Sequence, residues 1–148
     1  MFRGSSTHKL DQKGRLSIPS RFKKEIESED SNLLFLTIMD SCIKAYPESK
    51  WKKLELNFKN QKNKSKKMRR FYRTFIGNVS ECEIDKQGRI IIPPNLRDYA
   101  ELEKDVVLVG VLEEFEIWSE HKWAEETKQH EDDLDLEEFQ EEIAALGL

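Results

Sequence analysis

The stretch Asp11-Gln12-Lys13-Gly14-Arg15-Leu16-Ser17-Ile18-Pro19 decides how the whole chain is interpreted, because it occurs twice. The second copy, 74 positions later, reads Asp85-Lys86-Gln87-Gly88-Arg89-Ile90-Ile91-Ile92-Pro93. Both copies share Asp-x-x-Gly-Arg, then an apolar residue, any residue, Ile and Pro. A further match relates residues 46–51 to residues 118–123, with an offset of 72. One structural unit therefore occurs twice along the chain, with a small change in length inside it.

Each half of the motif has a structural reason. Asp11 and Asp85 open a tight turn, because an Asp side chain accepts hydrogen bonds from nearby backbone N–H groups. The glycines Gly14 and Gly88 tolerate the positive φ that such turns require. The apolar residues that follow are typical of a strand, and Pro19 and Pro93 end it because proline cannot donate to a ladder. The sequence thus predicts two rigid turns, each followed by a short strand.

The turns carry cations, Arg15 with Lys13 in the first copy and Arg89 with Lys86 in the second. Two cations on a protruding turn are suited to binding an anion. In the alternative interpretation, the Asp and Arg of each motif pair only with each other. The presence of two copies favours a functional role for both turns.

At these residues the chain resembles the MraZ family, bacterial proteins built from two tandem SpoVT-AbrB domains. The resemblance rests on the opening Met1-Phe2-Arg3-Gly4, on the two Asp-x-x-x-Arg motifs with their Ile-Pro, and on the length, and it covers positions 1 to about 145. It implies a DNA-binding transcriptional regulator that binds short G-rich direct repeats upstream of a cell-division and cell-wall gene cluster. It also implies a ring-like homo-oligomer of roughly eight or more subunits.

The implied fold is α+β. In relatives with a single motif, two chains interleave their hairpins into one barrel. Here both AbrB-type units lie on one chain, so the resemblance implies an intramolecular pseudo-dimeric, swapped-hairpin β-barrel with peripheral helices. The composition agrees, because neither unit alone has enough apolar residues for a stable core. We expect a first unit at residues 5–51, a basic helical linker at 52–76, a second unit at 77–123 and an acidic helical tail at 124–148.

The sequence predicts several elements inside this plan. Strands are expected at His8 to Asp11, Leu33 to Met39 and Cys42 to Tyr46, and Ser20 is expected to be the N-cap of a short helix. The second unit repeats this order, and Ser119 is expected to cap the helix that follows it.

Composition excludes several classes of protein. Of the 148 residues, 37% are hydrophobic and 36% charged, so the core is small. The apolar runs are far shorter than the roughly 20 residues that cross a bilayer, and no secretory signal is visible. Cys42 and Cys82 form no C-x-x-C motif, and we interpret them as reduced, partly buried residues of a cytoplasmic protein. The DNA-binding role that the resemblance implies makes us expect association with the nucleoid. We expect no membrane partner.

The net charge of −4 conceals a steep asymmetry, since residues 1–75 hold 19 Lys/Arg against 8 Asp/Glu. Residues 59–73 contain eight cations and no acid. Met68, Phe71, Tyr72 and Phe75 recur there at helical spacing, so this segment either binds DNA directly or packs its stripe on the core. We favour the core for the stripe and a non-specific attraction to phosphate for the cations.

The C-terminal segment is acidic, with 14 Asp/Glu and two lysines in residues 113–148. Leu136, Phe139, Ile143 and Leu146 form a stripe on an expected last helix. We expect this helix to dock on its own domain or on a neighbouring subunit, with a solvated acidic tail as the alternative.

Enzyme chemistry has little support in the sequence. The three histidines lack metal-ligand spacing, and no P-loop, G-x-S-x-G or G-x-G-x-x-G motif is present. We therefore expect no catalytic residues, metal, cofactor or small-molecule substrate.

DNA binding is supported by the chemistry of the turns. Arginine presents a planar fork of donors that fits guanine in the major groove, while lysines hold phosphates and fix the register. The candidate DNA-binding residues are Arg15, Lys13, Arg89, Lys86, Arg3 and Lys9. Arg15 is expected to dominate, because further cations lie near it in sequence, whereas Glu81 and Glu83 precede the second turn.

A different class of function stays open. AbrB-type barrels also serve as antitoxin modules, in which a flexible acidic tail wraps a partner protein. The acidic C-terminus fits that role loosely. The tandem motif argues against it, because such antitoxins typically carry one copy per chain.

Overall fold

The computed structural model describes all 148 residues and repeats one order of elements twice. The first round consists of β1 (Ser5–Lys9), β2 (Arg15–Ser17), α1 (Ser20–Glu27), β3 (Leu33–Met39), β4 (Cys42–Pro47) and α2 (Glu48–Asn60). The second consists of β5 (Ser80–Glu83), β6 (Arg89–Ile91), α4 (Pro94–Tyr99), β7 (Asp105–Gly110), β8 (Phe115–Ser119) and α5 (Glu120–Asp133). Helices α3 (Lys66–Phe75) and α6 (Glu137–Ala144) follow the two rounds. The α+β class and the tandem repeat are therefore confirmed.

The two rounds exchange strands. The six-stranded sheet has the order β1-β7-β8-β4-β3-β5, which reads the same from either edge when equivalent strands are matched. Strand β1 pairs with β7 of the second round, and β5 pairs with β3 of the first. The equivalent strands β4 and β8 meet at the centre. This exchange is compatible with the swapped-hairpin barrel that was expected.

The motif strands form a separate two-stranded ribbon. Strands β2 and β6 run antiparallel, with Leu16 opposite Ile90 at the midpoint. The backbone N–H of Ile92 donates to the carbonyl of Gly14 at 2.8 Å, and that of Ile18 donates to Gly88 at 2.9 Å. These reciprocal bonds relate the two motifs by a local two-fold axis. Each turn is therefore held in part by the strand of the other motif.

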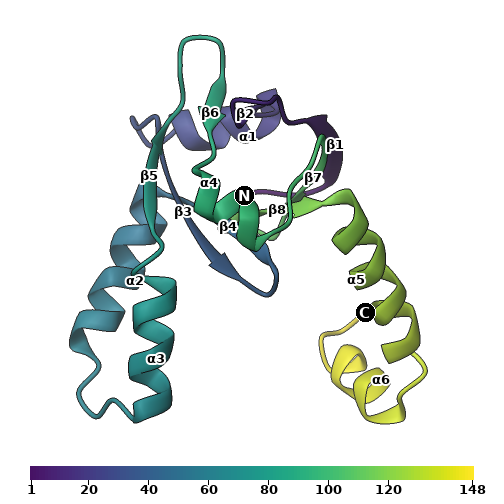
Figure 1. Ribbon diagram of the computed structural model, residues 1–148. Coiled ribbons are helices and arrows are strands. Elements are labelled where there is room, and N and C mark those ends of the chain that lie inside the picture. The colour runs from purple at the N-terminus through teal and green to yellow at the C-terminus, as the bar shows by residue number, and fades with distance from the viewer.

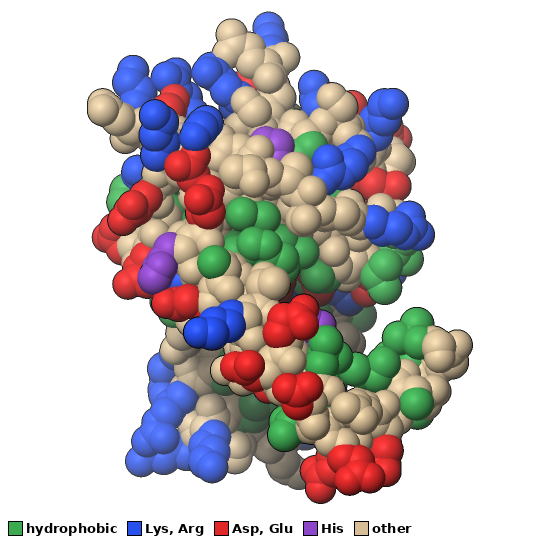
Figure 2. All heavy atoms as spheres, turned by 90° about the vertical axis from the view of Figure 1, so that its right-hand side faces the viewer, with side chains coloured by type: hydrophobic (Ala, Val, Ile, Leu, Met, Phe, Trp, Pro, Cys, Tyr) green, Lys and Arg blue, Asp and Glu red, His purple; other side chains and the backbone are tan.

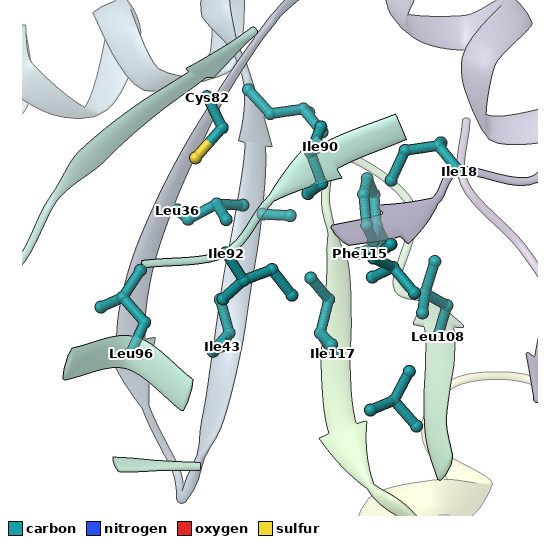
Figure 3. Packing of buried hydrophobic residues seen from close by; sticks show 14 of the residues in the cluster. Ile18, Leu36, Ile43, Cys82, Ile90, Ile92, Leu96, Leu108, Phe115 and Ile117 are labelled. Atoms are coloured by element: carbon teal, nitrogen blue, oxygen red, sulfur yellow. The ribbon is translucent and has the colours of Figure 1, made fainter. Parts of the chain in front are cut away.

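The core lies between this ribbon and the large sheet (Figure 3). Its main cluster contains 21 buried residues from both rounds of the repeat. Ile92 of the second motif lies close to Ile43 and Ile117 of the central strands (Figure 3). The pattern shared by the two motifs is thus explained by burial, because both residues that precede proline, Ile18 and Ile92, are core residues.

Two helical hairpins extend from this body, and Figure 1 shows them at the end opposite the β5–β6 turn, on opposite sides. One is α2–α3 and the other is α5–α6. Trp51 and Phe75 stack at 5.8 Å between α2, α3 and the sheet. The aromatic stripe of α3 is therefore packed as expected at Phe71 and Phe75, whereas Met68 is 39% exposed.

Three expectations about local structure were wrong. The basic segment is not one helix, because α2 ends at Asn60 and α3 begins only at Lys66, where the hydroxyl of Ser65 accepts the N–H of Met68 at 3.1 Å. Ser20 does not cap α1, since Pro19 occupies the N-cap position. The first strand ends at Lys9, because the turn begins at once. The Ser119 cap is confirmed, with its hydroxyl 3.0 Å from the N–H of Lys122.

The apolar stripe of the last helix is only partly covered, with Phe139 and Ile143 half-buried. Leu136 is 57% exposed and Leu146 is 77% exposed, and α6 folds back on α5 rather than onto the sheet. The expected docking on the chain's own domain is therefore not seen for α6. No helix is both long and apolar enough to span a membrane.

Candidate nucleic-acid interface

The first turn is organised by the carboxylate of Asp11. One oxygen accepts the backbone N–H groups of Lys13 and Arg15, each at 2.9 Å. The other oxygen accepts the Nε–H of Arg15 at 2.5 Å. Gly14 closes the turn with a bond to the carbonyl of Asp11 and has a φ of +80°. The motif therefore needs Asp, Gly and Arg together, as the sequence predicted.

The pairing of Asp11 with Arg15 leaves most of the guanidinium free. Only Nε is used, so the two terminal amino groups make no hydrogen bond within the protein. The side chain of Arg15 is about one third exposed, at 35%. The two interpretations of the motif are thus compatible, because the carboxylate orients the arginine and leaves its outer donors available.

The second turn repeats the backbone pattern with a looser ion pair. Asp85 accepts the backbone N–H groups of Gln87 at 2.8 Å and Arg89 at 3.0 Å. The Nε of Arg89 is 3.6 Å from the carboxylate and is buried without a hydrogen bond. Gly88 again has a positive φ, of +76°. Arg89 is therefore less firmly oriented than Arg15.

The hydrogen bonds within each turn also lower the pKa of the Asp side chain that accepts them. The backbone N–H of Arg15 is the largest cause that lowers the pKa of Asp11 below its ordinary value, and the Arg15 side chain adds to it. The backbone N–H of Arg89 is the largest cause for Asp85, whose pKa is likewise lowered. Both groups are consequently anionic at neutral pH, and each turn keeps its ion pair there.

A cation from the opposite round lies over each turn. A Cβ added to Gly14 would lie 2.9 Å from Cζ of Arg97, which belongs to α4. A Cβ added to Gly88 would lie 3.7 Å from Nζ of Lys23, which belongs to α1. Lys23 and Arg97 occupy equivalent positions, each four residues after the motif proline.

Each turn is therefore a composite of two turn cations and one helix cation. Lys23 is among the cations near the first turn in sequence, but it lies over the second turn, and Arg97 lies over the first turn, where no such cation was predicted. Alignment of the two copies beyond the proline would have shown that Lys23 and Arg97 are equivalent. The strand exchange then places each helix cation over the turn of the other motif.

Of the other candidate DNA-binding residues, only some lie on the turns. Lys13 and Lys86 are exposed on their turns. Lys9 forms an ion pair with Asp105 of β7, so its charge is partly neutralised. Arg3 lies beyond the far end of β1, about 20 Å from the first turn for an extended strand. Its carbonyl accepts a bond from Arg21, and the structure does not bring it to the turn.

The basic segment at residues 59–73 also lies apart from the turns. It forms the end of the α2–α3 hairpin, at the opposite end of the molecule (Figure 1). These cations therefore cannot reach a straight DNA duplex that lies on the turns of the same copy.

The fold and this site define a class of small tandem-repeat proteins in which two units exchange strands and present a pair of cationic turns. The family model described as "MraZ protein, putative antitoxin-like" matches residues 1–74 and 75–142. The chain belongs to the MraZ family.

Several relatives match along the whole chain. A protein of Desulfosudis oleivorans is 47% identical over 148 residues and one of Desulforapulum autotrophicum is 46% identical, with both chains covered completely. A protein of Natranaerobius thermophilus is 43% identical over 97% of this chain and 96% of its own. Each of the three is named "Transcriptional regulator MraZ".

Proposed function

We propose that this protein is a sequence-specific DNA-binding transcriptional regulator that acts through its two Asp-x-x-Gly-Arg turns. The observation that carries the proposal is the arrangement of Arg15, whose Nε is anchored by Asp11 while its terminal amino groups stay free. The names of the full-length relatives support the same role. The targets are short G-rich direct repeats upstream of a cell-division and cell-wall gene cluster, as the family resemblance implies.

Direct readout by Arg15 uses the geometry of its guanidinium. A guanine presents O6 and N7 as two acceptors in the major groove, which a planar pair of N–H donors matches. Because Asp11 already fixes the orientation of the side chain, little conformational freedom is lost when the contact forms. Arg89 makes a weaker version of the same contact, since its own ion pair is longer.

Phosphate contacts come from the cations around each arginine. Lys13 and Arg97 flank the first turn, and Lys86 and Lys23 flank the second. Such contacts position the protein on the duplex without reading sequence. Because the helix cations come from the opposite round, both turns need the complete interleaved fold.

Avidity raises the affinity further. We propose a ring-like homo-oligomer of roughly eight or more subunits, in which neighbouring turns engage boxes about one helical turn, ~10 bp, apart. Each single contact is weak, and their combination is selective for repeated boxes. A regulator of this kind acts in the cytoplasm, in association with the nucleoid.

A second candidate is an antitoxin-like interaction module, which the family description favours. The exposed apolar residues of the acidic α5–α6 hairpin give it a surface for a basic partner protein. Recovery of a small basic protein bound through residues 130–148 would support this candidate over the first.

A mobility-shift assay on the protein's own upstream region tests the proposed function. Deleting the repeats one by one should weaken binding in steps, and unrelated DNA of the same length should compete poorly. Equal competition by unrelated DNA would contradict sequence-specific binding.

A further inference from the structure

Two equivalent parts of the molecule carry opposite charges of equal size. We call residues 48–75, with α2 and α3, the basic hairpin, and residues 120–148, with α5 and α6, the acidic hairpin. The basic hairpin holds eleven Lys/Arg and two Asp/Glu, a formal charge of +9. The acidic hairpin holds eleven Asp/Glu and two Lys, a formal charge of −9. The internal repeat relates them, since Trp51 and Trp123 occupy matching positions in α2 and α5.

Most of these charges have no partner within the chain. On the basic hairpin Lys50 and Lys52 form ion pairs. On the acidic hairpin Lys122 pairs with Glu101, and among the acids only Glu125 contacts a basic side chain, the imidazole of His121. None of the ion pairs in the structure joins one hairpin to the other. The two charged surfaces are therefore unsatisfied in a single copy.

Both hairpins also expose apolar side chains among their charges. On the basic hairpin, Leu56 is 57% exposed and Met68 is 39% exposed. On the acidic hairpin, Leu136, Leu146 and Leu148 are exposed by 57% to 92%. Figure 2, which faces the α5–α6 side, shows acidic side chains gathered at its lower end with apolar side chains beside them. Apolar residues ringed by charge are typical of a protein-binding surface.

The placement of the hairpins favours a second copy of this chain as the occupant. They project from one end of the molecule on opposite sides, so a single copy cannot bring them together (Figure 1). A neighbouring copy placed alongside can present its basic hairpin to the acidic hairpin of the first. Contact between two like hairpins is disfavoured by repulsion, because each carries a large charge of one sign.

We propose that the basic hairpin of one copy binds the acidic hairpin of the next, in a head-to-tail contact that repeats around the assembly. This inference rests on the proposed homo-oligomer and names the surfaces that join its subunits. A head-to-tail contact uses two different surfaces and closes into a ring when its rotation allows. The turns of all copies then face the same side, away from the hairpins.

The contact also assigns a role to the basic segment. In the assembly its cations neutralise a neighbour's acids and are not available to phosphate. Single exposed ion pairs contribute little, so the contact depends on many charges together and on the apolar residues between them. It should weaken steeply with salt, because the screening length falls from about 8 Å at 0.15 M to about 3 Å at 1 M.

Charge reversal on the full chain tests the contact. One variant carries Lys53→Glu, Lys59→Glu, Lys62→Glu, Lys66→Glu, Lys67→Glu and Arg70→Glu, which changes the basic hairpin from +9 to −3. The other carries Glu131→Lys, Asp132→Lys, Glu137→Lys, Glu138→Lys, Glu141→Lys and Glu142→Lys, which changes the acidic hairpin from −9 to +3. All twelve side chains are exposed and make no hydrogen bond or ion pair, so both variants should keep their fold.

The readout is the molar mass by light scattering after size exclusion, without DNA. The wild type should give a multiple of its 17.5 kDa chain, and each variant alone should fall to the single chain. An equimolar mixture of the two variants should regain a large assembly with alternating copies, which also shows that both are folded. A control that exchanges Lys for Arg and Arg for Lys at the six basic positions should keep the wild-type mass.

Three results would overturn the proposed contact: a monomeric wild type, reversed variants with the wild-type mass, or a mixture that stays dissociated. The measurement is independent of DNA, so it can fail while the turns still bind their target. Conversely, a restored mixture supports the contact even if the turns bind no DNA.

Discussion

The backbone carbonyl of Gly14 accepts a hydrogen bond from the backbone N–H of Ile92 at 2.8 Å, which ties the first motif's turn to the second motif's strand. The matching bond joins Gly88 to Ile18. Because each turn rests on the other unit, a change in one motif is transmitted to both. The two candidate sites are therefore parts of one structure and cannot be separated by cutting the chain between the units.

Gly14→Ala should destabilise the protein more than Gly88→Ala. Both positions have positive φ, which costs an L-residue about 1–2 kcal/mol. At Gly14 the new Cβ would also lie 2.9 Å from the backbone oxygen of Ile92 and from Arg97, whereas at Gly88 it meets only the flexible Lys23 at 3.7 Å. Urea unfolding of the two variants measures the difference, and equal losses would mean that the close approach at Gly14 is easily relieved.

Arg15→Ala should weaken specific DNA binding by about 1–3 kcal/mol for each subunit that contacts DNA, the value of one bidentate base contact. In an oligomer the losses combine, so specific binding should nearly disappear. Arg89→Ala should cost less, because Arg89 is less firmly oriented. Binding isotherms and thermal melting on the same preparations check this. Unfolding or dissociation of Arg15→Ala would instead make Arg15 a structural partner of Asp11.

Asp11→Asn should reveal a stability that depends on pH. The pKa of Asp11 is lowered in the folded protein, so its contribution is present above its unfolded-state pKa of about 3.9 and is lost as the pH falls through its folded-state pKa. The variant should therefore be less stable than the wild type at pH 7, with a gap that closes in strong acid. Urea unfolding from pH 7 to 2 measures it. Asp132→Asn, at an exposed position, is the control and should change stability little.

Both cysteines should resist alkylation in the folded protein. Burial raises the pKa of the Cys82 thiol to about 11 and also raises the pKa of Cys42. The reactive thiolate is then scarce at pH 8. Mass spectrometry after iodoacetamide treatment should find both thiols unmodified in buffer and modified in denaturant. Rapid labelling in buffer would show that the core opens readily.

Much of the fold could be predicted from the sequence, because local signals are strong in the repeat. The strand Leu33–Met39 was predicted at its observed bounds, since it is an apolar run interrupted only by Thr37 and ended by the turn at Asp40 and Ser41. The strand exchange followed only from the family resemblance. Hydrophobic periodicity does not indicate which two strands pair in a sheet, as the pairing of β1 with β7 illustrates.

The parts that were missed depend on long-range contacts. Arg97 was overlooked because its relation to Gly14 arises from the exchange of strands and not from nearness in sequence. The break in the basic segment was missed because its cations were treated as one group, although Ser65 is a standard N-cap signal. The partly exposed stripe of α6 shows that an apolar pattern indicates a surface to be covered but does not indicate which partner covers it.

The most direct test of the proposed readout is a cycle that combines a base analogue with a variant. Fluorescence anisotropy would compare the wild type and Arg15→Ala on a repeat-containing duplex, and on the same duplex with 7-deazaguanine, which lacks the N7 acceptor. If Arg15 binds guanine, the analogue should weaken the wild type about 5-fold or more and should leave Arg15→Ala almost unchanged. If the analogue weakened both proteins equally, Arg15 would not be the residue that reads guanine, and the central claim would be contradicted.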